Sequence, residues 1–108
     1  MKILCIGDVC GSCGCNTLRK LLPALKLKHN IDLCIVNGEN SHDKNGIVKQ
    51  TSDDIFVSGA DIITTGNHVF RKSSVFSYLD DKDEILRPLN YPSECPGHGD
   101  VVVNIDGY

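Results

Sequence analysis

Short apolar runs alternate along this chain with longer stretches in which apolar and polar residues are mixed. The runs at residues 2–8, 31–36 and 60–65 predict β-strands, and a shorter run at 84–86 predicts a fourth. The first run is almost continuously apolar, which is the pattern of a strand buried on both faces. A last strand is expected at 101–105.

Residues 16–28 predict an amphipathic helix, because leucines recur there at spacings of three and four residues. Pro23 lies inside this stretch and should kink the helix or restart it, at a cost of about 3 kcal/mol if nothing relieves the lost hydrogen bond. The recurring leucines are Leu18, Leu21, Leu22 and Leu25.

Two shorter helices are expected between the later strands. One should begin with Thr51 or Ser52 as its N-cap and stop at Gly59, and the other covers residues 73–79. Strands and helices therefore alternate, which is typical of a parallel sheet with helices packed on its faces. The predicted fold class is α/β, a layered sheet of mainly parallel strands flanked by helices.

The end of the sequence has the composition of a long loop followed by a hairpin. Residues 87–100 are rich in proline and glycine, and Asp106-Gly107 is a dipeptide preferred in two-residue hairpin turns. Such a turn normally precedes a returning strand, yet only Tyr108 follows it. We therefore expect a chain truncated in the middle of a hairpin.

Composition and charge narrow the class of protein. With 108 residues, 41% hydrophobic and 23% charged, the chain has the make-up of one globular domain. A formal net charge of -3 gives no strong signal for binding nucleic acid or a membrane surface. The sequence shows neither a signal peptide nor an apolar run of about 18 residues, so we expect a cytoplasmic protein without a membrane partner. The oligomeric state is open, and a homo-oligomer is one alternative.

Polar side chains follow each of the first three predicted strands. Asp8 ends the first, Glu39 and Asn40 follow the second, and Asn67 and His68 follow the third. Ligands of open parallel sheets bind at the carboxyl ends of the strands, so we expect these side chains to converge. Carboxylate and amide oxygens can hold divalent cations, and the histidine could bind a metal or carry a proton. Each residue taken alone has a plain alternative as a cap or a loop residue.

Four segments resemble, in order and with matching spacing, the YmdB-type family of calcineurin-like metallophosphoesterases. The resemblance covers nearly the whole chain, and NGEN followed by TGNH is its most specific part. It implies a calcineurin-like metallophosphoesterase fold with two divalent metal ions, which could be iron, manganese or magnesium. It also implies hydrolysis of phosphodiesters such as 2',3'-cyclic nucleotides. The segments are MKILCIGDVCGSCG, IDLCIVNGEN, GADIITTGNHVF and LRPLNYP.

The same resemblance implies a role for each residue at the strand ends. Asp8, Asn40 and Asn67 are similar to metal ligands of the family, and Glu39 is similar to the ligand that bridges both metals. His68 is similar to the family's proton donor.

Family members are more than twice as long as this chain, and their second half supplies further histidine ligands. Residues 1–108 are therefore expected to be the N-terminal portion of a single metallophosphoesterase domain. Two carboxylates and two amides would hold two cations poorly without those histidines. A truncated or degenerate module that binds a nucleotide or a metal without catalysis is therefore an alternative.

Six cysteines are many for this length, and three of them form the pattern Cys10-x-x-Cys13-x-Cys15. Without an export signal, reduced thiols are expected rather than disulfides. A thioredoxin-like redox pair or a thiolate metal site is a second alternative, although no other cysteine pair completes a zinc site. The glycine-rich loop from Gly7 to Gly14 could also bind phosphate at a helix N-terminus, but it lacks the spacing of known nucleotide-binding loops.

Overall fold

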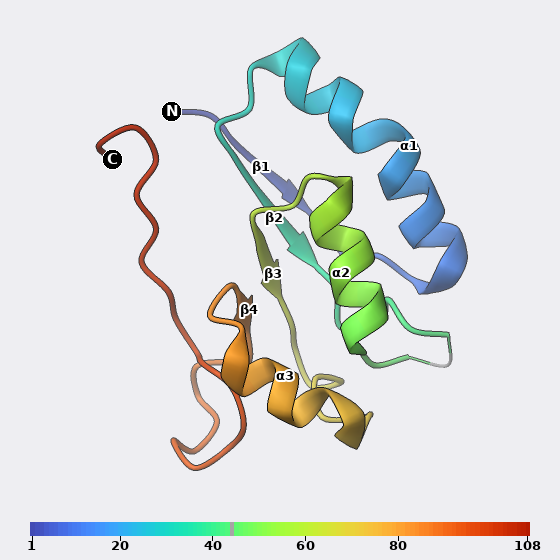
Figure 1. Ribbon diagram of the computed structural model, residues 1–108, viewed down its shortest axis with the longest axis vertical. Helices are drawn as coiled ribbons and strands as arrows, with labels where there is room; N and C mark the ends of the chain where they lie inside the picture. Colours follow the sequence, from blue (N-terminus) through green and yellow to red (C-terminus); the bar gives the residue numbers. More distant parts are fainter. Residues whose placement is uncertain (44) are drawn as a thin grey trace.

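A four-stranded parallel sheet forms the centre of the computed structural model, which describes residues 1–43 and 45–108 (Figure 1). The strands are neighbours in the order in which they occur along the chain, and every pairing is parallel. The predicted α/β class is therefore confirmed. The strands are β1 (Ile3–Ile6), β2 (Leu33–Asn37), β3 (Ile62–Thr64) and β4 (Ile85–Leu86).

Helices α1 (Gly11–His29) and α2 (Lys49–Ser58) lie side by side over the sheet (Figure 1). A 3-10 turn at Ser73–Val75 continues into α3 (Phe76–Asp81), close to the predicted third helix. In the described part of the chain, no helix has the length and apolar character needed to cross a membrane. The core joins all three helices to the sheet through Leu18, Leu22, Val36, Ile55, Ile63, Leu79 and Ile85.

Strand β1 is less buried than its apolar sequence predicts. Ile3 is 48% exposed and Cys5 is exposed as well, whereas Leu4 and Ile6 pack against the core. Within the described residues, β1 is an edge strand with one uncovered face. The prediction of a strand buried on both faces is wrong for this chain, because an apolar run does not reveal what covers each face.

Helix α1 begins at Gly11, before the predicted start at residue 16. Two hydrogen bonds to the loop after β2 hold its first turn: the Gly11 N–H donates to the Asn40 carbonyl (2.9 Å), and the Ser12 N–H donates to the Asp43 carboxylate (3.1 Å). Neither acceptor is close in sequence, so local patterns gave no signal for this start. The helix continues through the exposed Pro23 as a single element, and the alternative of a restart there is wrong.

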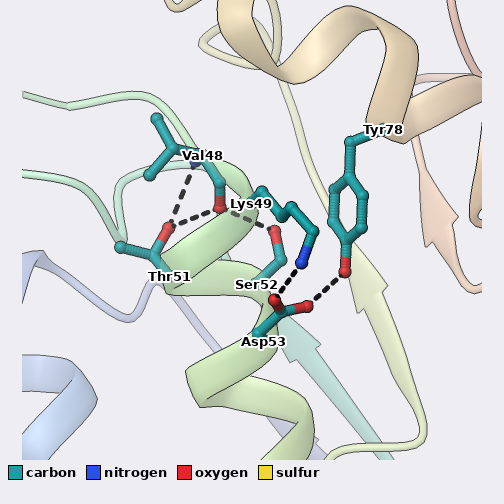
Figure 2. Close-up of polar contacts among 6 residues, drawn as sticks. All are labelled: Val48, Lys49, Thr51, Ser52, Asp53 and Tyr78. Atoms are coloured by element: carbon teal, nitrogen blue, oxygen red, sulfur yellow. Dashed lines mark hydrogen bonds and ion pairs between the residues drawn. The ribbon is translucent and has the colours of Figure 1, made fainter.

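Helix α2 begins at Lys49 with Val48 as its N-cap, so the predicted cap at Thr51 or Ser52 is wrong. The Thr51 hydroxyl accepts a hydrogen bond from the Val48 N–H (3.2 Å). The hydroxyls of Thr51 and Ser52 each donate to the Val48 carbonyl (3.0 Å each), as Figure 2 shows. The two hydroxyls therefore support the first turn from inside the helix. The predicted stop at Gly59 is confirmed by its φ of 119°, in the left-handed region that favours glycine.

A polar cluster joins α3 to α2 (Figure 2). The Tyr78 hydroxyl donates to the Asp53 carboxylate (2.5 Å), and the Lys49 ammonium pairs with the same carboxylate (2.6 Å). The hydrogen bonds from Lys49 and Tyr78 lower the pKa of Asp53 below its usual value. Burial and the bond to Asp53 raise the pKa of Tyr78 far above its usual value.

Residues 101–105 do not form the predicted strand: residues 101–104 have no regular secondary structure, and the chain bends at Ile105. Among the residues that the structure describes, no strand pairs with them, and an extended segment becomes a β-strand only when a neighbour shares its hydrogen bonds. Val102 is 95% exposed while Val101 and Val103 are half-buried, so this segment still presents alternate residues to two sides.

The hairpin turn predicted at Asp106-Gly107 is confirmed. Both residues have positive φ angles, 49° and 87°, as a tight two-residue hairpin turn requires. The flanking residues Ile105 and Tyr108 exchange both backbone N–H···O bonds, at 3.0 and 2.9 Å.

Candidate functional site

The loops that follow β1, β2 and β3 come together at one edge of the sheet, as the parallel topology predicts. Backbone hydrogen bonds join them in turn: the Val9 N–H donates to the Asn37 carbonyl (3.0 Å), and the Gly38 N–H donates to the Thr64 carbonyl (3.0 Å). Neighbouring strands therefore fix the backbone beneath the predicted site residues.

Asp8 lies on the loop after β1. Its φ of 30° falls in the left-handed region that residues with a side chain seldom adopt. The Asp8 carboxylate accepts a hydrogen bond from the Asn40 side-chain amide (2.8 Å), which joins the first loop to the second. Asp8 is exposed, so this carboxylate is open to a ligand from solvent.

Glu39 follows β2, and its carboxylate lies against the loop after β3. Its Oε2 accepts from the His68 backbone N–H (3.1 Å), and its Oε1 accepts from the Asn37 side-chain amide (3.3 Å). Gly66 permits this approach, because any Cβ at that position would overlap the Glu39 carboxylate. Packing and two donors therefore hold this largely buried charge in one place.

The His68 imidazole is oriented by Asn40. Its Nδ1 lies 2.5 Å from Asn40 Oδ1, and Asn40 uses its amide nitrogen to donate to Asp8. Since Oδ1 can only accept, we assign the hydrogen to Nδ1, which leaves Nε2 as the ring nitrogen open to a substrate. Glu39 Oε2 lies 3.9 Å from His68 Nδ1, so a protonated imidazole would have a carboxylate within ion-pair range.

Four of the five predicted site residues thus form one hydrogen-bonded series, from Asp8 through Asn40 and His68 to Glu39. Asn67 differs from them. Its side chain is exposed, and among the described residues it makes no hydrogen bond to the other four. Its role as a metal ligand stays a prediction.

Two open cavities border the site. One of about 500 Å³ runs along α1 and is mostly apolar, with Asp8 at one end. The other, of about 420 Å³, lies between the first turn of α1 and the loop after β2, and Asn40, His42 and Asp43 are among its lining residues. Both have the size of typical small-ligand pockets, roughly 300–1,000 Å³. His42, a loop histidine, is half-buried and lines the more polar cavity.

The donor atoms suit divalent cations in kind but are too few to complete a metal site. The carboxylates of Asp8 and Glu39 and the amide oxygens of Asn40 and Asn67 are hard oxygen ligands, which magnesium and manganese prefer. Among the described residues, however, no three His, Cys, Asp or Glu side chains gather as a metal-binding group. The donor types therefore suit a divalent cation, but the described residues do not by themselves complete its coordination.

The cysteines after Asp8 do not gather as a thiolate metal site in the described part of the chain. Cys10 is exposed as the N-cap residue of α1, Cys13 is exposed in its first turn, and Cys15 is buried. Desolvation, a hydrogen bond to the Asp8 carboxylate and the charge of that carboxylate raise the pKa of the Cys10 thiol.

Two site-positioning residues were missed by the sequence reasoning. Asn37 donates to Glu39, and Asp43 accepts from the first turn of α1. Asn37 begins the NGEN motif, so the motif itself held the signal for it. Asp43 had no comparable signal, because its partner lies 31 residues away in the sequence.

The parallel sheet and the polar strand ends define a class, the α/β proteins that bind a ligand at the carboxyl edge of the sheet. Comparison with known proteins identifies the family within this class. The family model described as "YmdB-like protein" matches residues 4–108. The chain therefore belongs to the YmdB-like family, as its motifs predicted.

Individual relatives agree with this assignment. The 2',3'-cyclic-nucleotide 2'-phosphodiesterase of Bacillus subtilis (strain 168) is 39% identical over 107 residues, which are 99% of this chain and 40% of that protein. The crystal structure of a novel phosphatase from Mycoplasma pneumoniae matches with a TM-score of 0.90 and 30% identity, over 98% of this chain and 39% of that one. A hypothetical protein from Thermus thermophilus gives a TM-score of 0.88 and 31% identity, over 99% of this chain and 41% of that one. This chain spans about two fifths of the length of these relatives.

Proposed function

We propose that residues 1–108 are the N-terminal portion of a metal-dependent phosphodiesterase whose substrates are phosphodiesters such as 2',3'-cyclic nucleotides. The activity named for the Bacillus subtilis relative supports this reaction class. For this chain, the carrying observation is the hydrogen-bonded series of Asp8, Asn40, His68 and Glu39 at the carboxyl edge of the sheet.

We assign Asp8, Glu39, Asn40 and Asn67 as ligands of two divalent metal ions, with Glu39 shared between them. Iron, manganese and magnesium all suit this assignment. Metal ions bound there would supply an activated water and offset the negative charge of the phosphate. Because this chain fits only part of such a centre, the proposal places the remaining ligands in the further length that the relatives have.

His68 is the proposed general acid. Asn40 holds its Nδ1–H, so Nε2 is the atom that would face the leaving oxygen of a bound phosphodiester. A protonated His68 would give its Nε2 proton to that oxygen as the ester bond breaks, and the Glu39 carboxylate lies 3.9 Å from its Nδ1. Glu39 would thus influence both the metal centre and the acid.

The setting of the reaction stays a prediction from the sequence. We place the protein in the cytoplasm, acting on a small phosphodiester and not on a membrane. A homo-oligomer is compatible with this proposal.

Activity of the full-length protein tests the proposal. We expect it to hydrolyse bis(p-nitrophenyl) phosphate and 2',3'-cyclic AMP when manganese is present. Asp8→Asn and Glu39→Gln should lose manganese binding, measured by titration calorimetry, and activity with it. His68→Ala should keep manganese binding but lose about 10²- to 10⁴-fold in kcat, the usual contribution of a general acid.

The matched control is His29→Ala, since His29 is an exposed histidine at the end of α1, away from the strand-end loops. This variant should behave as the wild type. A normal rate in His68→Ala would refute the general-acid role, and manganese-independent hydrolysis would refute the metal-dependent reaction.

A further inference from the structure

The exposed pair Cys10 and Cys13 lies where α1 begins, and the proposed reaction uses neither thiol. Cys10 has an extended backbone (φ -103°, ψ 121°) as the N-cap residue, and Cys13 lies in the first helical turn. The Gly14 N–H donates to the Cys10 carbonyl (2.9 Å), so this turn is closed around the pair. Residues three apart on a helix have Cβ atoms about 5–6 Å apart, and a disulfide needs a Cβ separation of about 3.5–4.5 Å. Cys10 lies outside the helix, so its backbone is not held at the helical spacing, and the proposed disulfide requires a rotation at Cys10 that brings the two Cβ atoms within this range.

Both thiols are open to the same reagents. Cys10 and Cys13 are exposed, and each lines both of the cavities beside the site. Cys15 and Cys34 are buried and therefore shielded. Cys5 is exposed, but it lies on β1 rather than in this turn.

We propose that Cys10 and Cys13 are a redox modification site that forms a reversible disulfide. With hydrogen peroxide as the oxidant, the Cys13 thiolate attacks one peroxide oxygen and hydroxide leaves, which gives a sulfenic acid and, after protonation, one water. The Cys10 sulfur then attacks the Cys13 sulfur, and the sulfenic oxygen leaves as a second water. Two thiols and one peroxide thus become one disulfide and two waters. A dithiol reductant reverses the change by thiol–disulfide exchange.

Oxidation would change the surroundings of Asp8. Cys10 lies two residues after Asp8 and lines the same cavity along α1, and its thiol hydrogen is lost when the disulfide forms. Asp8 would then keep the Asn40 amide as its side-chain donor. This second part of the proposal rests on the function proposed above, in which Asp8 is a metal ligand.

Thiol mapping tests the disulfide. The full-length protein would be treated with hydrogen peroxide, its remaining thiols alkylated, and its peptides analysed by mass spectrometry. We expect Cys10 and Cys13 in one internally cross-linked peptide that dithiothreitol returns to two thiols. Cys5→Ser should give the same result as the wild type. Cys13→Ser should give no such cross-linked peptide, because Cys10 then has no partner. Independent alkylation or separate overoxidation of Cys10 and Cys13 in the wild type would overturn the proposal.

A manganese titration tests the link to Asp8. We expect the dissociation constant of manganese to change several-fold between the reduced and oxidised wild type, and to be unaffected by the same treatment in Cys13→Ser. Equal constants in the two states of the wild type would refute the link while leaving the disulfide in place. Failure of the reduced protein to bind manganese would instead refute the proposed function.

Discussion

Single side chains at this site depend on each other for their orientation. The Asp8 carboxylate fixes the Asn40 amide, and that amide fixes which nitrogen of His68 carries hydrogen. Glu39 depends on a different kind of partner, since the absence of a side chain at Gly66 leaves the room that its carboxylate occupies. The geometry of the site therefore depends on the absence of a side chain at Gly66 as well as on the side chains that are present.

We predict that Gly66→Ala weakens the site without unfolding the protein. The new methyl group would displace the Glu39 carboxylate and break its bond with the His68 N–H. A lost hydrogen bond to a charged group costs about 1.5–3 kcal/mol, so manganese affinity should fall by about 10- to 100-fold. Titration calorimetry would measure this.

Gly7→Ala is the matched control for that substitution. Gly7 also precedes a predicted ligand, but a Cβ there would have no atom within 4 Å. Manganese affinity should stay near the wild-type value in this variant. An equal loss in both variants would show that crowding of Glu39 is not the cause.

At the scale of elements, the Tyr78–Asp53 hydrogen bond joins α3 to α2 (Figure 2). We predict that Tyr78→Phe lowers the free energy of unfolding by about 0.5–1.5 kcal/mol, the usual net value of one hydrogen bond. Urea denaturation would measure the change. Tyr108→Phe is the control, because Tyr108 is 77% exposed and its hydroxyl should contribute little.

The same hydrogen bond predicts how stability depends on pH. The pKa of Asp53 is lowered on folding, so its contribution is present above about pH 4 and is lost as the pH falls further. The pKa of Tyr78 is raised, so its contribution is present below about pH 10 and is lost as the pH rises further. The stability difference between wild type and Tyr78→Phe should thus be constant from about pH 5 to 9 and shrink on both sides. A difference that is unchanged at pH 3 would contradict this account.

At the scale of the whole molecule, one core connects the helices to the sheet. Ile63 is fully buried in β3. Its side chain packs over the backbone of Gly38, together with the side chains of Ile55 and Ile47. We predict that Ile63→Ala lowers the free energy of unfolding by about 2–5 kcal/mol, because the cavity it leaves cannot fully collapse.

Val57→Ala is the control for this core deletion. Val57 is 82% exposed on α2, so its truncation should change the free energy of unfolding by no more than about 0.5 kcal/mol. Thermal and urea denaturation of both variants would check the pair. Equal effects would mean that the core does not carry the stability of this chain.

Sequence alone determined the order and type of the main elements. Apolar runs located β1 to β4, since a strand in a parallel sheet is marked by its own residues. Local chemistry also located the Gly59 stop and the Asp106-Gly107 turn, because both need positive φ angles that few residues accept. The strand-end residues Asp8 and His68 followed from the same reasoning, since topology brings strand ends together.

Only the tertiary structure decided features that depend on partners distant in sequence. The first turn of α1 begins at Gly11 because acceptors from the loop after β2 reach it. The faces of β1 are unequally covered, and residues 101–105 have no strand beside them within the described chain. The assignment of hydrogen to Nδ1 of His68 likewise needed the position of Asn40. A residue pattern indicates which secondary structure each segment favours. The burial of a segment, its strand pairing and the position of its protons depend instead on the residues that folding places next to it.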